Sequence, residues 1–223
     1  MPRGSALPLP DCQNGGQRSV DVPWERLAGW VGRYDARHAA TVWSVSDGVL
    51  EASSPDGSRV AIAIPFDTGE VTHLDDVFTH LSRPWRLGIV LVRRGGFAVA
   101  RVTGPETVES KVGRRHVQGK TKAGGWSQHR FANRRDNQAK AAFDAAAEHV
   151  ARLLLPHAAG LAMVGTGGDR NALSAVLERP RLRVLAARPQ RWLGGFADPN
   201  RDVLAQAVLA ARSVTVRLYD PDS

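Results

Sequence analysis

The sequence predicts an α/β protein that consists of a tail at residues 1–20, a small α+β unit at residues 21–82 and a larger α/β domain at residues 83–223. Three observations predict this organisation. Short β-rich runs separated by glycine-containing turns occur in both parts, a long amphipathic helix follows a basic segment, and helices then alternate with strands. A chain of 223 residues with 43% apolar content is long enough to bury a sizeable core.

The first part of the chain carries local signals for one helix and two tight turns. Residues 1–20 mix Pro, Gly, Ser, Asn and Gln without periodicity, which predicts a flexible tail. After Asp21, apolar residues recur at helical spacing, and these are Trp24, Leu27, Val31 and Tyr34. They predict a helix of about four turns. Residues 41–66 then contain three β-rich runs separated by Asp47-Gly48 and Asp56-Gly57, dipeptides that are typical of hairpin turns.

The larger part begins with strands and continues with alternating elements. Three strand-like runs predict an antiparallel meander, at residues 86–92, 96–102 and 106–112. A basic segment leads into a long helix predicted at residues 127–155. The remaining predicted elements are strand 160–166, helix 170–178, strand 181–187, helix 199–213 and strand 214–220. This is the element order of a ribonuclease-H-like α/β domain, in which crossover helices cover both faces of the sheet.

The net charge of +8 is concentrated in one window of the sequence. Residues 111–140 hold nine basic residues against Asp136 alone, so this window supplies the whole net charge. The nine are Lys111, Arg114, Arg115, Lys120, Lys122, Arg130, Arg134, Arg135 and Lys140. A localised excess of this kind is expected of a protein that binds nucleic acid, because phosphates attract a focused patch. The alternative is a solvated charged loop and helix face.

The composition predicts a cytoplasmic protein. Cys12 is the single cysteine, which excludes an internal disulfide, and no Cys/His cluster has the spacing of a structural zinc site. The first ten residues lack the apolar stretch of a signal peptide, and no apolar run is long enough to cross a membrane. The sequence therefore predicts no metal, no cofactor and no membrane partner.

Residues 117–125, "VQGKTKAGG", connect the meander to the long helix and predict a projecting basic loop. Glycine permits positive φ and a close approach of the backbone to a substrate, as Gly124 and Gly125 would provide. Lys120 and Lys122 give the loop affinity for phosphate. The alternative is that the glycines only end a loop and that Ser127 caps the helix.

The stretch "GGWSQHRFANRRDNQ", residues 124–138, resembles the loop and helix of the catalytic domain of eukaryotic and archaeal class I release factors. In that family a Gly-Gly-Gln tip is followed by a serine, an Arg-Phe pair and a further basic residue. The sequence is more similar to the stand-alone Vms-type peptidyl-tRNA hydrolases and their bacterial relatives, in which a serine precedes the glutamine. By this resemblance Gln128 is the catalytic glutamine, Gly124 and Gly125 are the paired glycines, and Arg130 and Phe131 are the Arg-Phe element.

The resemblance covers residues 84–223 and implies a reaction and its partners. It implies hydrolysis of the ester between nascent peptide and tRNA on stalled or split ribosomes, without stop-codon reading, since no decoding domain is present. The partners would be peptidyl-tRNA and the peptidyl-transferase centre of the large subunit. The residues expected to bind RNA are Lys120, Lys122, Trp126, His129, Arg130, Arg134 and Arg135.

The chain departs from the family pattern at the tip. Trp126 and Ser127 stand between the paired glycines and Gln128, so the tip is longer than Gly-Gly-Gln. Trp126 stacks on a terminal base of the tRNA in one interpretation and packs against the body of the domain in another. His129 is a conceivable proton carrier, but its place in the first helical turn favours contact with phosphate or solvent.

Two other motifs are not interpreted as functional sites. Gly15-Gly16-Gln17 has the letters of the release tripeptide, yet neither a preceding strand nor a basic run supports it as the site. "GTGGDR", residues 165–170, lacks the third glycine of a dinucleotide fingerprint and predicts a strand-to-helix turn that Asp169 helps to hold.

Two alternative functions use the same basic patch. One is a non-catalytic module that binds tRNA or rRNA, and the other is an RNA endonuclease that cuts near the 3′ end of tRNA. A metal-dependent nuclease needs carboxylates clustered on its strands. The predicted strands 86–92, 160–166 and 181–187 contain no Asp or Glu, which favours ester hydrolysis.

Overall fold

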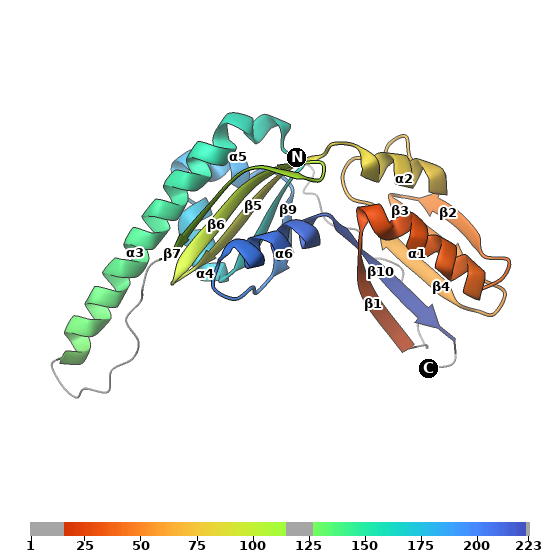
Figure 1. Ribbon diagram of the computed structural model, residues 1–223, viewed down its shortest axis with the longest axis horizontal. Helices are drawn as coiled ribbons and strands as arrows, with labels where there is room; N and C mark the ends of the chain where they lie inside the picture. The colour runs from red at the N-terminus through yellow and green to blue at the C-terminus, as the bar shows by residue number, and fades with distance from the viewer. Residues whose placement is uncertain (1–15, 115–126, 222–223) are drawn as a thin grey trace. The chain divides into compact units, whose positions relative to one another are not determined.

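The computed structural model describes residues 16–114 and 127–221. The chain divides into two compact units, which we call unit 1 (Met1–Arg83 with Arg212–Ser223) and unit 2 (Pro84–Ala211). Each has a five-stranded sheet of its own (Figure 1). Among the described helices, none is both long and apolar enough to cross a membrane.

Unit 1 is an antiparallel sheet with two helices. Its strands lie in the order β1-β10-β4-β3-β2. In chain order the elements are β1 (Gly16–Pro23), α1 (Trp24–Arg37), β2 (Val42–Ser46), β3 (Val49–Ser53), β4 (Arg59–Ala63), α2 (Leu74–Ser82) and β10 (Ser213–Asp220). The helix predicted after Asp21 is confirmed as α1, and the three β-rich runs are confirmed as β2, β3 and β4.

The turn between β2 and β3 has the backbone that its sequence demands. Asp47 and Gly48 both have positive φ, at 50° and 74°. Positive φ at both central residues is the pattern of a type I′ turn, whose twist matches that of the two strands it joins. Asp and Gly tolerate this conformation better than other residues, which is why the dipeptide predicts the hairpin.

Two sequence predictions about unit 1 are wrong, and both concern the ends of the chain. Residues 16–20, expected within the flexible tail, form the first half of β1. The strand expected at residues 214–220 within the larger domain is β10, which pairs with β1 and β4 in unit 1 (Figure 1). The larger domain thus ends at Ala211. Val214 and Val216 alternate with more exposed residues and are buried, so this strand completes the core of unit 1.

Unit 2 is a mixed sheet in the strand order β7-β6-β5-β8-β9. These strands are β5 (Arg86–Arg93), β6 (Gly96–Thr103), β7 (Glu106–Arg114), β8 (Met163–Gly168) and β9 (Gln190–Gly194). β5, β6 and β7 pair antiparallel, which confirms the predicted meander. β8 pairs parallel with β5, and β9 pairs parallel with β8. The mixed α/β architecture is therefore confirmed.

The helices of unit 2 pack on its sheet and bury apolar residues against the strands. They are α3 (Ser127–Leu154), η1 (Leu155–Gly160), α4 (Arg170–Leu177), η2 (Pro180–Leu182), α5 (Arg183–Ala186) and α6 (Arg201–Ala211). Val90 and Val92 of β5 share a core with α3 and α4. Ile89 and Leu91 alternate with them along the strand and are also buried, so the opposite face of the sheet is covered as well.

The prediction of a strand at residues 181–187 is wrong. These residues form η2 and α5, and the strand follows as β9. Leu182 and Leu185 are fully buried and lie three residues apart, which is helical spacing, whereas Val184 between them is 50% exposed. Pro180 at the start of η2 provides the fixed φ that favours a helical first turn.

Candidate functional site

The candidate residues fall into two groups. The first group lies in the opening turns of α3 and consists of Gln128, His129, Arg130, Arg134 and Arg135. For this group the structure describes the backbone. The second group lies outside the described residues and consists of Lys120, Lys122, Gly124, Gly125 and Trp126.

The start of α3 at Ser127 makes Gln128 the second residue of the helix. The first four N–H groups of an α-helix have no carbonyl partner inside the helix, and the N–H of Gln128 is one of them. The dipole of the helix places partial positive charge at this end. Arg130 and Arg134 are four residues apart and therefore lie on one face of the helix.

The second half of α3 anchors the helix to the sheet. Its buried residues are Ala142, Ala146, Ala147, Val150, Leu153 and Leu154. Small alanine side chains let the helix axis lie close to the strands. Figure 1 shows that the opening turns of α3 extend past the edge of this sheet, so the packed half holds the end that carries Gln128.

One aromatic contact joins the meander to α3. Phe97 of β6 is 5% exposed and lies directly opposite Gly113 of β7 in the strand register. Its ring stacks on the imidazole of His149 from α3, with the centroids 5.2 Å apart and the planes at 27°. A Cβ atom at position 113 would lie 2.3 Å from the Phe97 ring, so the glycine makes room for it.

His149 is favoured as a neutral ring in this contact. Burial lowers the pKa of His149 below its usual range, and the positive charges of Arg152 and Lys111 lower it further. Lys111 and Lys140 are members of the basic window whose side chains the structure describes, and both are exposed. The positive charge of the window therefore extends to the base of the predicted loop and along α3.

Two exposed ion pairs connect α3 to the segment that follows α4. Arg179 bonds to Asp144 at 2.7 Å, and Arg181 bonds to Glu148 at 2.6 Å. The hydrogen bond from Arg181 lowers the pKa of Glu148 below its usual range. Exposed pairs of this kind contribute little to stability because solvent screens them, so they orient α3 more than they stabilise it.

The segment "GTGGDR" is a strand-to-helix turn, as predicted. β8 ends at Gly168, whose φ is 100°, and α4 begins at Arg170. The carboxylate of Asp169 accepts a hydrogen bond from the N–H of Ala172 at 2.8 Å and caps α4. The glycines also serve packing, because a Cβ at Gly165 would lie 2.7 Å from Leu193.

The literal tripeptide is partly in a strand. Gly16 and Gln17 belong to β1 and pair with Asp220 and Tyr219 of β10, while Gly15 lies outside the described residues. Gln17 thus lies in a strand that is paired with β10, whereas Gln128 lies in the first turn of α3, where its backbone N–H has no carbonyl partner inside the helix. Across the part of the chain that the structure describes, no three His, Cys, Asp or Glu residues gather as a metal site would require.

The anchoring residues Phe97, Gly113 and His149 were not singled out from the sequence. They come from three different elements, and the pairing of Phe97 with Gly113 becomes visible only with the register of β6 on β7. The one signal available was a glycine directly after the predicted strand 106–112, because glycine in or beside a strand often marks a close approach.

Comparison with protein families places the chain among release factors. The family model that matches describes the Actinobacteria/chloroflexi VLRF1 release factor, and it matches residues 85–217. This is more than half of the chain, so the chain belongs to this family. The matched range includes nearly all of unit 2 and the whole of α3.

Two solved structures are similar to the chain at low identity. The archaeal translation termination factor aRF1 has 15% identity and a TM-score of 0.36, with 72% of this chain and 51% of that chain covered. A structure described as "Archaeal protein" has 13% identity and a TM-score of 0.32, with coverages of 72% and 52%. The chain thus spans about half the length of each. No curated protein matches it.

Proposed function

We propose that this protein is a cytoplasmic peptidyl-tRNA hydrolase that cleaves the ester between nascent peptide and tRNA on stalled or split ribosomes, in ribosome rescue or quality control. One observation carries the proposal: the release-factor family match contains the segment that joins the paired glycines and Gln128 to a long helix. The resemblance to Vms-type hydrolases supports the same activity. The strand order of unit 2 supports a ribonuclease-H-like framework for it.

Gln128 is the proposed catalytic residue. Attack of water on the ester carbonyl forms a tetrahedral oxyanion, and a preorganised donor near that oxygen lowers the barrier. The N–H of Gln128 is available at the start of α3, and the helix dipole favours the negative charge that develops there. Its side-chain amide would position the water, and Gly124 and Gly125 would let the backbone approach the acceptor end.

The basic residues are proposed to hold RNA. Lys120 and Lys122 of the loop, with Arg130, Arg134 and Arg135 of α3, would contact phosphates of the acceptor stem or of rRNA in the peptidyl-transferase centre. Trp126 would stack on a terminal base. His129, in the same turn as Gln128, would contact a phosphate.

The test is incubation with ribosome-bound peptidyl-tRNA, followed by analysis of both products. Ester hydrolysis releases free peptide and leaves the tRNA at full length. A shortened tRNA would instead identify an endonuclease. Binding without any released peptide would identify a module that only binds RNA.

Binding to tRNA or ribosomes is expected to depend strongly on salt. If about five phosphates are contacted, the plot of log affinity against log salt has a slope near −4, at roughly 0.7 to 0.9 per contact. Arg130→Ala combined with Arg134→Ala should flatten the slope by about 1.5. Filter binding at a series of salt concentrations measures it, and an unchanged slope in the double variant would remove these two residues from the interface.

Peptide release is expected to persist in EDTA when ribosome integrity is maintained. An amide and a backbone N–H stabilise the transition state without a metal ion, and neither needs to ionise. The measurement is the release rate from ribosomal complexes prepared to remain intact, before and after chelation. An absolute requirement for manganese together with a shortened tRNA would contradict this mechanism.

A further inference from the structure

Unit 1 contains a pocket that the proposed function does not use. It has a volume of about 290 Å³ and lies between α1 and the adjacent strands β1 and β10. Three arginines and three rings line it: Arg18, Arg33, Arg37, Trp30, Tyr34 and His38. Ligand pockets typically measure about 300 to 1,000 Å³, and this pocket lies at the lower limit of that range. Its size therefore suits a single nucleotide rather than a duplex.

The rings form a continuous stack on one face of α1. Trp30 stacks on Tyr34 at 5.5 Å and 19°, and Tyr34 stacks on His38 at 4.4 Å and 29°. The spacing of four residues between successive rings places them along one face of the helix. Tyr34 is only 6% exposed, whereas Trp30 at the end of the stack is half-buried. Trp30 therefore retains surface for a planar ligand.

Three arginines and one carboxylate, Asp220, line the pocket. Arg18 is paired with Asp220 at 2.6 Å, but Arg33 and Arg37 make no ion pair with a described residue. Arg37 lies in the last turn of α1, where a cation favours the helix dipole. Arg33 lies one turn earlier, so the helix end does not account for it. Guanidinium groups have the fork geometry that recognises phosphate.

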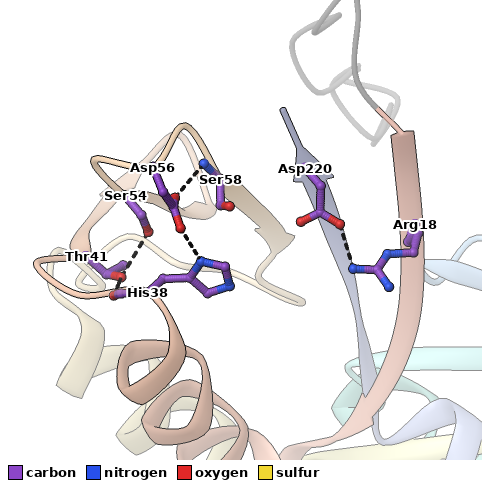
Figure 2. A network of polar contacts seen from close by, with 7 residues as sticks. All are labelled: Arg18, His38, Thr41, Ser54, Asp56, Ser58 and Asp220. Atoms are coloured by element: carbon purple, nitrogen blue, oxygen red, sulfur yellow. Dashed lines mark hydrogen bonds and ion pairs between the residues drawn. The ribbon is translucent and has the colours of Figure 1, made fainter. Parts of the chain in front are cut away.

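Hydrogen bonds fix the orientation of the His38 ring, which lines the pocket. Its Nδ1 lies 2.7 Å from the carboxylate of Asp56, which also accepts a hydrogen bond from the N–H of Ser58 at 2.9 Å. The hydroxyl of Thr41 donates to the carbonyl oxygen of His38 at 2.6 Å. Figure 2 shows the other ring nitrogen of His38 facing the side where Arg18 and Asp220 lie.

We propose that this pocket binds one nucleotide of single-stranded RNA, with its phosphate on Arg33 and Arg37 and its base on Trp30. Phosphate contacts from arginine together with an aromatic platform are the two components of single-strand binding. An acidic peptide would use the arginines but not the indole. All the residues that line this pocket belong to unit 1.

The test measures the affinity of the full chain for a fluorescent oligoadenylate by anisotropy. All variants carry Arg130→Ala and Arg134→Ala, so that the basic window of unit 2 contributes equally throughout. Arg33→Ala with Arg37→Ala should weaken binding about tenfold or more, because hydrogen bonds to charged groups are lost. Trp30→Leu, which keeps an apolar side chain against Tyr34, should weaken it about tenfold.

The control pair is Arg26→Ala with Arg59→Ala, which removes the same charge from exposed positions of unit 1 outside the pocket. It should change the affinity less than about twofold, the effect expected of screened surface charge. An equal loss in the control, or an unchanged affinity in the pocket variants, would overturn the proposal. Competition by polyglutamate or by adenosine monophosphate as effective as by unlabelled oligoadenylate would overturn the assignment to RNA.

Discussion

Gln128→Ala is expected to lower peptide release by about a hundredfold or more, the usual scale for the loss of a preorganised transition-state donor. The residue lies in the first turn of α3, away from the packed half of the helix, so the substitution should leave the fold intact. Alanine favours a helix, and the backbone N–H at this position is retained. The remaining activity would therefore report what that N–H contributes without the side chain.

The matched control is Gln17→Ala. Gln17 is an exposed residue of β1 and pairs through its backbone with Tyr219, so its side chain can be removed without disturbing the ladder. Release should be unchanged within about twofold, on the usual scale for a surface substitution. If this variant lost release while Gln128→Ala retained it, the literal tripeptide would be the site.

Gly125→Ala tests the backbone of the tip separately from the glutamine. It should impair release if residue 125 needs positive φ or a close approach to the acceptor end. Binding to ribosomes should fall far less than turnover in Gln128→Ala and Gly125→Ala, because the proposed phosphate contacts carry the affinity. A parallel loss of binding and release would assign these residues to substrate binding instead.

Local signals in the sequence predicted the elements of this fold well. Asp47-Gly48 specifies its hairpin through two backbone conformations, and the apolar spacing after Asp21 specifies α1. The pairing of β1 with β10 was not predictable in the same way. Arg18 and Asp220 are bonded across 202 residues of sequence, and no local pattern states which strand will lie beside another.

The candidate site was likewise predictable only in part from local sequence. The residues proposed for chemistry and RNA contact lie within one stretch, 120–135, so a short motif was enough to select them. The residues that hold α3 in place come from β6, β7 and the middle of the helix. Their relation depends on strand register and on helix packing, which a single sequence does not specify.

Gly113→Ala is expected to destabilise unit 2, because position 113 has no room for a methyl group. The Cβ would lie 2.3 Å from Cε1 and 2.5 Å from Cζ of the Phe97 ring. Replacing glycine in a strand ordinarily gains about 0.5–1 kcal/mol in backbone entropy. Overpacking a core costs typically about 1–3 kcal/mol, and the Phe97 ring is confined between Gly113 and His149. The cost exceeds the gain, so denaturant unfolding should show a net loss of about 1–2 kcal/mol.

The same substitution should also reduce peptide release at temperatures where the protein is still folded. A displaced Phe97 ring presses on His149, and His149 belongs to the helix that carries Gln128. Gly95→Ala is the control, since a Cβ there meets Asp198 at 3.5 Å, an ordinary contact distance. Phe97→Leu added to Gly113→Ala should recover part of the stability, because the smaller side chain leaves space for the methyl group. Additive losses in that double variant would show that Gly113 and Phe97 do not compete for the same space.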